Sequence, residues 1–319
     1  MNAAPSEAAV RAPLPRWPRC WYVVARSAEL APGQVDSGEL AGLPYVLFRS
    51  AAGELVALDA HCPHMGTHLR HGQVIGEQLR CPLHHWRLDR EGRCRGSEGH
   101  EKARSRVWPV AEQFGLIFLY PGDGAPPPLP APAAPADYAW TTGRPVELDT
   151  DWRAMMVHGF DLLHLRAVHH REVVEMPELG EREGAARLSY VSRVSGGGLS
   201  DRLMKFFSGN RIRVRQSCHG ATMVVESEVG RERTAALLGL TVRGGKVRAF
   251  GAFGTRRDGA LVGLKLLFTR YLFTAFLRRD FAVIEGVKLA IDGSDDPGVR
   301  TIASFLRGLP ELAGGEKNG

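Results

Sequence analysis

A proline-rich segment divides this chain and constrains its fold more than any other feature. Residues Pro121–Pro135 read PGDGAPPPLPAPAAP. Each proline fixes φ and lacks the amide donor that a helix or a sheet needs, so the segment predicts a semi-extended connector. A chain of 319 residues is long enough for about two domains. We therefore expect a first domain over residues 1–120, a linker over 121–139 and a second domain over 140–319.

The composition is that of an ordinary globular protein. Hydrophobic residues make up 44% and charged residues 24% of the chain, which excludes wholesale disorder and collagen-like repetition. The net charge is +6, but no block of Lys and Arg is interleaved with aromatic residues, so we expect no nucleic-acid binding. The longest apolar stretch contains Lys265 and Arg270, so we expect no membrane span.

Five cysteines stand at unrelated spacings, and the N-terminus lacks the pattern of a secretory signal. We therefore expect a cytoplasmic protein, because thiols stay reduced in that compartment and there bind metals more often than each other.

The apolar pattern predicts an α+β protein. Upstream of the linker, short apolar runs bounded by Gly, Pro or Ser indicate a small antiparallel β domain. These runs are Trp21–Ala25, Tyr45–Phe48, Leu55–Leu58 and Leu116–Tyr120. Downstream, strand-like runs predict one large antiparallel sheet, at Leu188–Val194, Ile212–Cys218, Met223–Val229, Val247–Phe253 and Leu261–Phe268. Two helices are expected beside it, over Trp152–His170 and Arg278–Ile291.

Two short segments each pair one cysteine with one histidine. Cys62-Pro63-His64 is followed by Cys81-Pro82-Leu83-His84, so two loops each offer one thiolate and one imidazole. The spacing is compatible with a zinc site of two Cys and two His. It also fits a Rieske [2Fe–2S] cluster, in which two Cys hold one iron and two His hold the other. The mixed order favours the cluster, because a zinc finger usually groups its two Cys and then its two His.

A second constellation, Asp161, His164 and His169, has the spacing D-x2-H-x4-H. On an ideal helix the two imidazoles would point about 140° apart, so we expect a π-type turn between Leu162 and Val168 that brings them together. Two imidazoles and one carboxylate on one face of Fe(II) form a facial triad that leaves positions open for O2. The spacing alone does not identify the carboxylate.

The motifs Cys62-Pro63-His64-Met65-Gly66 and Cys81-Pro82-Leu83-His84-His85-Trp86 closely resemble those of the Rieske non-haem iron oxygenases. The resemblance extends over most of the chain and implies a catalytic domain of the helix-grip kind. It implies a [2Fe–2S] cluster held by Cys62, His64, Cys81 and His84, and Fe(II) held by His164, His169 and Asp280.

The third iron ligand is the least defined of these positions. Asp280 lies in the acidic segment Arg279–Glu285, which matches the position of that ligand in the family. The alternatives are Asp292, Asp295 and Asp296, which stand beside glycine and proline and have the pattern of turn residues.

The resemblance also gives Asp161 a role and shows two departures. It implies that Asp161 joins His84 of one subunit to His164 of its neighbour as an electron bridge, in a homotrimer. His85 stands where the family often has Gly, and His158 stands where it commonly has Asn. We expect His158 to pack or form a hydrogen bond rather than contact the metal.

The source of electrons must lie outside the chain. No G-x-G-x-x-G motif follows a predicted strand and no P-loop is present, so we expect a separate ferredoxin or flavin reductase. The resemblance implies the terminal component of an oxygenase of the monooxygenase-like branch. It would hydroxylate, demethylate or desaturate a small hydrophobic molecule, steroid-like or aromatic. A Rieske electron carrier and a zinc-stabilised interaction protein are the alternatives, but neither explains D-x2-H-x4-H.

Overall fold

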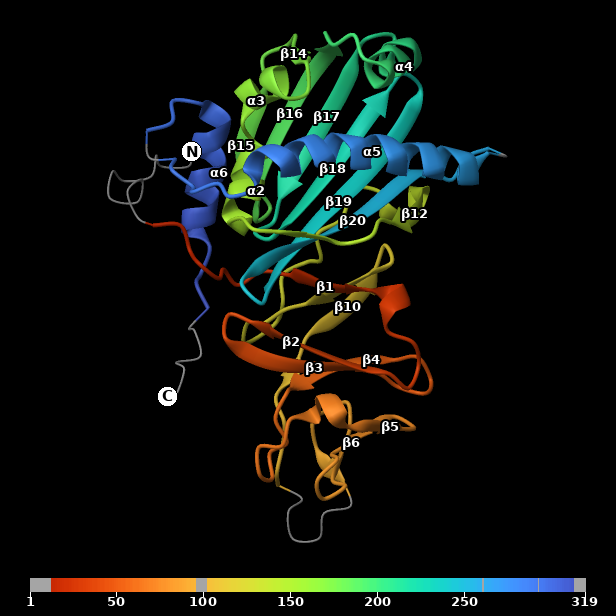
Figure 1. Cartoon of the computed structure of the whole chain (residues 1–319), viewed down its shortest axis with the longest axis vertical. Coiled ribbons are helices and arrows are strands. Elements are labelled where there is room, and N and C mark those ends of the chain that lie inside the picture. Colours follow the sequence, from red (N-terminus) through yellow and green to blue (C-terminus); the bar gives the residue numbers. More distant parts are fainter. Residues whose placement is uncertain (1–12, 96–101, 260, 292, 313–319) are drawn as a thin grey trace.

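The computed structural model describes residues 13–95, 102–259, 261–291 and 293–312. The chain forms an elongated molecule, with a large sheet and its helices at one end and small β-sheets at the other (Figure 1). The α+β class expected from the apolar pattern is confirmed.

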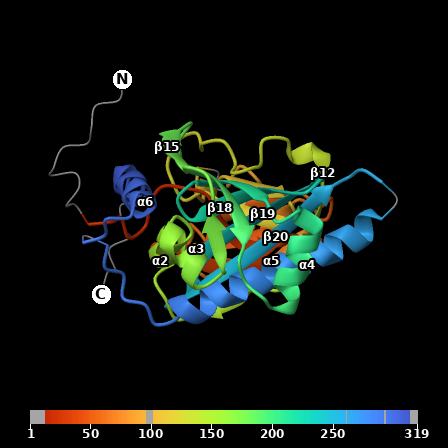
Figure 2. The same cartoon turned by 90° about the horizontal axis from the view of Figure 1, so that it is seen from above.

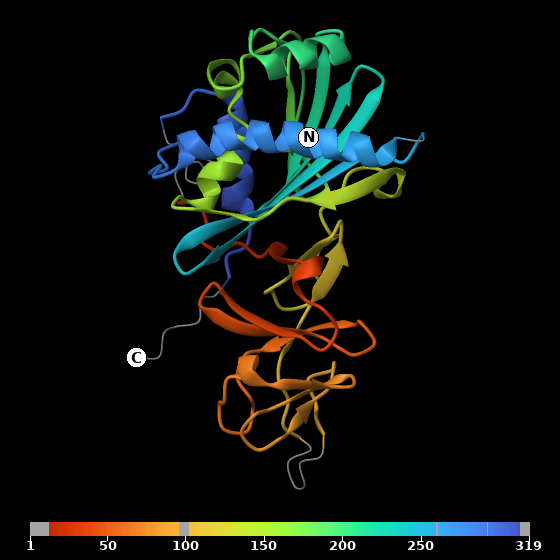
Figure 3. The same cartoon turned by 45° about the vertical axis from the view of Figure 1, so that its right-hand side comes forward.

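The N-terminal part consists of short antiparallel strands in three small sheets, counted over the described residues. The first contains β1 (Tyr22–Arg26), β10 (Val110–Gln113) and β11 (Leu116–Leu119). The second contains β2 (Val35–Leu40), β3 (Leu43–Arg49), β4 (Leu55–Asp59) and β9 (Val107–Trp108). The third contains β5 (Gln73–Ile75), β6 (Gln78–Arg80), β7 (Arg87–Leu88) and β8 (Cys94–Arg95). The 3-10 turns η1 (Ser27–Glu29) and η2 (Leu69–His71) connect them. Figure 3 shows the third sheet farthest from the large sheet.

The C-terminal part is built on one antiparallel sheet that joins nine strands of the described chain in the order β12-β20-β19-β18-β17-β16-β14, with β13 on β20 and β15 on β16. A 3-10 turn, η3 (Pro135–Asp137), precedes it. The strands are β12 (Tyr138–Thr142), β13 (Val146–Leu148), β14 (Arg171–Val173), β15 (Glu178–Arg182), β16 (Ala185–Val194), β17 (Ile212–Cys218), β18 (Thr222–Val229), β19 (Glu232–Arg243) and β20 (Lys246–Arg256).

One long helix, α5, runs across a face of this sheet, with two short helices near one of its ends (Figures 1 and 2). The helices are α2 (Trp152–His158), α3 (Leu162–Ala167), α4 (Leu199–Ser208), α5 (Val262–Ile284) and α6 (Pro297–Gly308). A cavity lies between α5 and the sheet, and His164, His169 and Asp280 are among the residues that line it.

The two faces of the large sheet have different partners, because side chains alternate along a strand. Val224 and Ala252 pack with Phe118 of the first small sheet in one hydrophobic cluster. Their neighbours in sequence, Val225 and Phe253, point to the opposite face and line a cavity under α5. The first small sheet therefore covers one face of the large sheet, and the cavity lies on the other face.

The two parts of the chain share a core. A Cβ at Gly239 of β19 would lie 2.0 Å from Cγ2 of Val23 on β1, so only glycine permits this approach. The proline-rich connector is attached to the same region, since Trp21 Nε1 donates a hydrogen bond to the carbonyl of Pro127 (2.8 Å). Leu129 also packs against this cluster.

The single helix expected over Trp152–His170 is wrong, because the segment contains two helices. Gly159 ends α2, and Asp161 starts α3 by accepting hydrogen bonds from the amides of Leu163 and His164. An aspartate at the N-cap satisfies amides that the first helical turn leaves unpaired, which favours a new helix start at this point. The π-type turn is also wrong, since the amide of Val168 donates to the carbonyl of His164 (2.8 Å) in the ordinary α-helical pattern.

The strand expected at Leu261–Phe268 and the helix expected at Arg278–Ile291 are also wrong. One helix, α5, runs from Val262 to Ile284 and covers nearly all of the first segment and half of the second. Its apolar residues lie all around the helix, so they show little of the periodicity that identifies a helix in sequence. It ends early because Gly286 adopts φ 72° and its amide donates to the carbonyl of Asp149. A left-handed glycine commonly stops a helix.

Candidate metal centres and cavity

The two Cys–His loops have the same backbone turn. The first joins β4 to η2, and the second joins β6 to β7. The amide of Gly66 donates to the carbonyl of Cys62 (2.9 Å), and the amide of His85 donates to that of Cys81 (3.2 Å). Gly66 and His85 both have positive φ, at 73° and 61°. His85 therefore occupies a left-handed position that glycine adopts without strain.

The structure brings the four side chains together at the end of the molecule. Cys62 and Cys81 are buried and their thiols interact, whereas His84 is exposed and His64 is half-buried. The rings of His64 and His84 have centroids 4.8 Å apart. Two thiols on the inside and two imidazoles on the outside match a cluster whose two irons have different ligands.

The environment of the thiols also fits a metal centre. Burial raises the pKa of Cys62 to about 11. The unliganded side chain is therefore a thiol at neutral pH, and metal binding has to displace its proton. On the outer side, the ring of His64 stacks on Trp86 with centroids 4.1 Å apart and an interplanar angle of 8°. This stacking holds one imidazole in a fixed orientation.

A second group of metal-binding side chains lies under α5. His164 is on α3, His169 follows the end of α3, and Asp280 is on α5. Nε2 of His169 lies 2.6 Å from Oδ1 of Asp280, and Nε2 of His164 lies 3.5 Å from the same oxygen. One ligand atom from each of the three residues lies within 4.8 Å of the other two. The structure thus gathers the three residues expected to hold iron.

His169 reaches this position because it lies outside the helix that carries His164. The helix α3 ends at Ala167, so the chain turns before His169 and the ideal-helix angle between the two imidazoles no longer applies. The rings of His164 and His169 therefore come together because α3 ends between these residues, and not because of a π-type turn.

A third imidazole lies at the same place. Nε2 of His158, the last residue of α2, is 3.4 Å from Oδ1 of Asp280. The rings of His158 and His164 have centroids 3.8 Å apart. Nε2 of His158 and Nε2 of His164 are both buried and have no hydrogen-bond partner among the described residues. Sequence reasoning named His158 but did not place it beside the carboxylate, because the break between α2 and α3 was not foreseen.

The protonation states suit metal binding. Burial on its own raises the pKa of Asp280, but the imidazoles of His158, His164 and His169 outweigh burial and hold that pKa well below its usual range. Burial lowers the pKa of His169, against the opposing effect of Asp280. The site therefore holds an ionised carboxylate next to a neutral imidazole, which are the forms that donate electron pairs to a metal.

Asp161 organises the same site from the start of α3. Its Oδ1 accepts hydrogen bonds from the amides of Leu163 (2.9 Å) and His164 (3.2 Å). Its backbone carbonyl lies 2.6 Å from Nδ1 of His164. A carbonyl can only accept, so Nδ1 of His164 carries the proton and Nε2 presents its lone pair toward Asp280. Within one chain, α3 and the Cys–His loops lie at opposite ends (Figure 1).

The alternative carboxylates have other partners. Asp296 caps α6 by accepting from the amides of Gly298 and Val299. Asp295 pairs with Arg300 on the surface. Asp292 lies outside the described residues.

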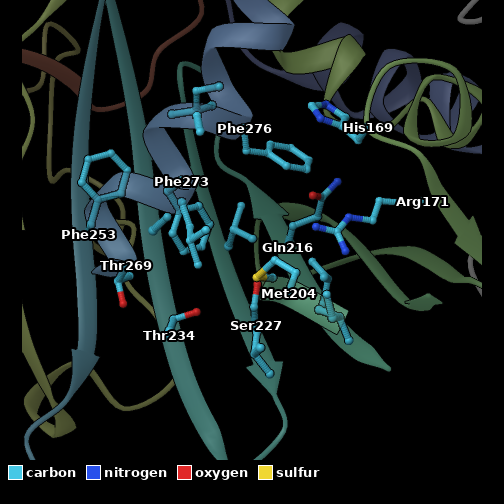
Figure 4. A pocket seen from close by; sticks show the side chains of 18 of the residues that line it. His169, Arg171, Met204, Gln216, Ser227, Thr234, Phe253, Thr269, Phe273 and Phe276 are labelled. Carbon is cyan, nitrogen blue, oxygen red and sulfur yellow. The ribbon is translucent and has the colours of Figure 1, made fainter. Parts of the chain in front are cut away.

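A cavity of about 920 Å³ extends from the three imidazoles along the space between α5 and the sheet (Figure 4). Its walls are mostly apolar, and Phe273 and Phe276 of α5 face Met204 of α4 across it. A few polar groups interrupt this lining, among them Arg171 and Gln216 at the end near His169. A concave apolar space with few polar groups is the usual form of a small-molecule site.

Comparison with protein families identifies the N-terminal part. Residues 20–111 match the Rieske [2Fe-2S] domain. This part of the chain is therefore a Rieske domain, and the cofactor inferred from the Cys–His pairs is confirmed as a [2Fe–2S] cluster.

Curated relatives match part of the chain. The chain is 31% identical over 148 residues to the oxygenase component of 3-ketosteroid-9-alpha-monooxygenase from Mycolicibacterium smegmatis, which covers 45% of this chain and 38% of that protein. It is 42% identical over 113 residues to 4beta-methylsterol monooxygenase from Methylococcus capsulatus, with coverages of 33% and 31%. These matches span well under half the length of either relative.

Solved structures share the whole fold. The structure of dicamba monooxygenase bound to dicamba aligns with a TM-score of 0.67 at 19% identity, over 91% of this chain and 97% of that one. The NdmA QL mutant of Pseudomonas putida CBB5 with caffeine aligns with a TM-score of 0.68 at 18% identity, over 91% and 89%. The resemblance to the Rieske non-haem iron oxygenases, stated from two motifs, is thus confirmed in sequence for part of the chain, which includes residues 20–111, and in fold for most of it. In the part of the chain that the structure describes, no helix combines the length and apolarity of a membrane span.

Proposed function

We propose that this chain is the terminal oxygenase component of a Rieske-type oxygenase. In this proposal Cys62, His64, Cys81 and His84 hold the [2Fe–2S] cluster, and His164, His169 and Asp280 hold Fe(II). The observation that carries the proposal is the pair of imidazoles and the ionised carboxylate at one end of an apolar cavity, in a chain that also contains a Rieske domain.

The residues of the chain contribute orientation, charge and exclusion of water. The iron, when bound, supplies the activation of O2. The carbonyl of Asp161 holds the lone pair of His164 toward the metal position, and Asp280 is ionised there without having to lose a proton. The apolar walls from α5 and the sheet place a hydrophobic substrate beside this position and keep water away from it.

Electrons come from an external ferredoxin or flavin reductase and enter at the exposed imidazole edge of the cluster. The cluster loops and the cavity lie at opposite ends of one chain, so transfer to the iron requires a neighbouring chain (Figure 1). We therefore propose a homotrimer in which the carboxylate of Asp161 joins His84 of an adjacent chain to His164. The division into residues 1–120, 121–139 and 140–319 belongs to the same proposal.

The substrate is a small hydrophobic molecule that is hydroxylated, demethylated or desaturated. Relatives are named for ketosteroid and methylsterol oxidation, and the cavity of about 920 Å³ has space for a molecule of that class. We also propose a cytoplasmic location, because each of the five cysteines is a free thiol in the structure and such thiols persist in reducing compartments.

The decisive test is metal analysis of protein purified without oxygen, together with its His164→Ala variant. We expect iron and acid-labile sulfide in a ratio of about three to two, and little zinc. The His164→Ala variant should lose one third of the iron and all substrate-dependent O2 uptake, while the visible absorption of the cluster remains. A ratio near one to one in the parent protein would indicate an electron carrier, and zinc without sulfide would indicate an interaction protein.

A further inference from the structure

A guanidinium group projects into the apolar cavity without a partner. Arg171 is the first residue of β14, two positions after His169, and its side chain points into the cavity beside Gln216 (Figure 4). Its Nη1 is buried and has no hydrogen-bond partner among the described residues. A buried charged donor that remains unpaired is unfavourable, so an arrangement of this kind indicates that a ligand completes it.

Of the charged groups around Arg171, the carboxylate of Asp201 favours its charged form and the guanidinium of Arg279 opposes it. Arg279 of α5 is a second guanidinium in the lining. The carboxylate of Asp201 is nearby, but it accepts a hydrogen bond from the amide of Gly198 at the start of α4. Among the described residues, no ion pair within 4.0 Å joins either arginine to a carboxylate. The carboxylate of Asp280 is surrounded by imidazoles.

The opposite end of the cavity differs. There Lys265 pairs with Glu232, with Nζ 2.8 Å from Oε1. Lys265 is therefore neutralised at that end, where Arg231 also lines the cavity, whereas Arg171 lies at the end that holds the three imidazoles.

We infer that the substrate is an apolar molecule with one carboxylate, which Arg171 binds while the apolar body lies along Phe273 and Phe276. The inference rests on the proposed function and adds the chemical class of the substrate. A planar guanidinium matches a carboxylate with two parallel hydrogen bonds, and the low polarity of the cavity strengthens them. Because Arg171 lies at the imidazole end, the oxidised carbon belongs to the part of the molecule near the acid group.

The test compares acids with their methyl esters by calorimetry on the intact protein, with the cluster oxidised and O2 excluded so that no turnover occurs. The probes are four apolar acids of different shape, each with its methyl ester: lithocholic acid, abietic acid, 1-pyrenebutyric acid and palmitic acid. We expect at least one acid to bind more than about tenfold more tightly than its ester, since hydrogen bonds to charged groups contribute about that factor or more.

The variants identify the responsible residue. In Arg171→Met the ratio of acid to ester affinity should fall to about one, whereas Arg171→Lys should keep part of it. Arg166→Met, which removes an exposed arginine of α3 outside the cavity lining, should leave the ratio unchanged. Equal binding of acids and esters, no binding of any probe, or an unchanged ratio in Arg171→Met would overturn the inference. Acid preference in a protein without mononuclear iron would instead refute the proposed function alone.

A separate observation concerns the ligand set itself. Nε2 atoms of three imidazoles lie within 3.5 Å of a single carboxylate oxygen, those of His158 (3.4 Å), His164 (3.5 Å) and His169 (2.6 Å). Nε2 of His158 is buried without a hydrogen-bond partner in the described part of the chain. A buried imidazole nitrogen that faces a carboxylate oxygen shared with two other imidazoles, yet forms no hydrogen bond, is typical of a metal ligand.

We propose that His158 is a further ligand of the mononuclear metal, which then has three imidazoles and one carboxylate. The proposal rests on the metal site of the proposed function. The rings of His158 and His164 lie side by side, 3.8 Å between centroids and 33° between planes, as ligands at adjacent coordination positions can. Two of six octahedral positions would then stay open.

Ligand counting tests this without turnover. The mononuclear site is emptied with a chelator, refilled with Mn(II), and studied by pulsed EPR in protein labelled with 15N-histidine. The number of coupled imidazoles should be three, and should fall to two in His158→Asn, with Mn(II) affinity reduced at least about tenfold. His170→Asn, at the exposed neighbour of His169, should change neither value. Two coupled imidazoles in the parent protein would refute ligation by His158, and absence of any Mn(II) site would refute the proposed function.

Discussion

The cluster loops and the cavity site hold their side chains in different ways. The four residues proposed to hold the cluster lie within 23 positions, residues 62–84, in two loops with the same hydrogen-bonded turn. The residues under α5 come from α3, from the turn after it and from a helix 111 positions further along. The first arrangement needs little more than two tight turns, whereas the second needs a helix break and the docking of α5 on the sheet.

Exposure separates the two regions as well. His84 is exposed, whereas His164 is 8% exposed and His169 is 1% exposed. An exposed cluster ligand suits the exchange of electrons with a partner protein. A buried metal site suits chemistry from which water is excluded. Damage to either region should therefore leave the other intact.

The largest effect is expected from Cys81→Ser, which removes one thiolate of the cluster. The variant should lose the visible absorption and the reduced EPR signal of the cluster, because serine is a poor ligand for this iron. The mononuclear metal should remain at about one per chain, measured by metal analysis. Cys94→Ser, at a buried cysteine outside the Cys–His pairs, should keep the cluster. Loss of both metals in Cys81→Ser would show that the two regions depend on each other.

The next effect concerns the proposed connection between the regions. Asp161→Asn should lower substrate-dependent turnover at least about 100-fold while both metal centres stay occupied. The helix start should survive, because asparagine caps a helix about as well as aspartate, so the thermal midpoint should change little. Asp161→Ala should also lose about 1 kcal/mol of the free energy of unfolding. Full turnover in Asp161→Asn would remove the electron bridge from the proposal.

His219 directly follows β17 of the large sheet. We expect its protonation to lower the stability of the fold in acid. Burial, assisted by Arg187, lowers the pKa of His219 from 6.5 to about 4. The unfolded chain takes up this proton near pH 6.5 and the folded chain does so only near pH 4. The contribution to stability is therefore complete above pH 6.5 and declines between these values, by at most about 3 kcal/mol.

Urea unfolding at pH 7.5 and at pH 5.0 measures this decline. The decrease in the free energy of unfolding between the two values should be smaller in His219→Gln than in the parent protein. An equal decrease in both proteins would assign the acid sensitivity to other groups.

The smallest effect is expected at the exposed tip. His85 has φ 61°, a conformation that costs an ordinary residue about 1 kcal/mol and glycine almost nothing. His85→Gly should therefore raise the free energy of unfolding by up to about 1 kcal/mol, measured by urea unfolding with the cluster in place. His85→Ala keeps the strained backbone and should give no gain. A loss of stability in His85→Gly would mean that the imidazole forms contacts worth more than the strain.

Sequence patterns predicted the features that depend on near neighbours in the chain. They failed for features that depend on packing between residues far apart. The Cys–His pairs were found from spacing, since each pair sits in one turn. Asp280 was named from a family resemblance, because no spacing relates it to His169. The error at Leu261–Phe268 arose from apolar residues that surround α5 without a clear period, and the error at Trp152–His170 arose because Asp161 was taken as a helix interior residue rather than a cap. The role of Asp161 as a cap was visible in principle, since aspartate is a preferred N-cap residue.

By itself the sequence determined the α+β class and the two loops that each pair a cysteine with a histidine. These depend on residue type and on contacts between near neighbours. Only the tertiary structure decided which carboxylate meets the imidazoles, that His158 joins them, and that Arg171 faces the cavity. Those relationships follow from how α5 and the strands pack, and packing depends on the summed burial of residues far apart in the chain.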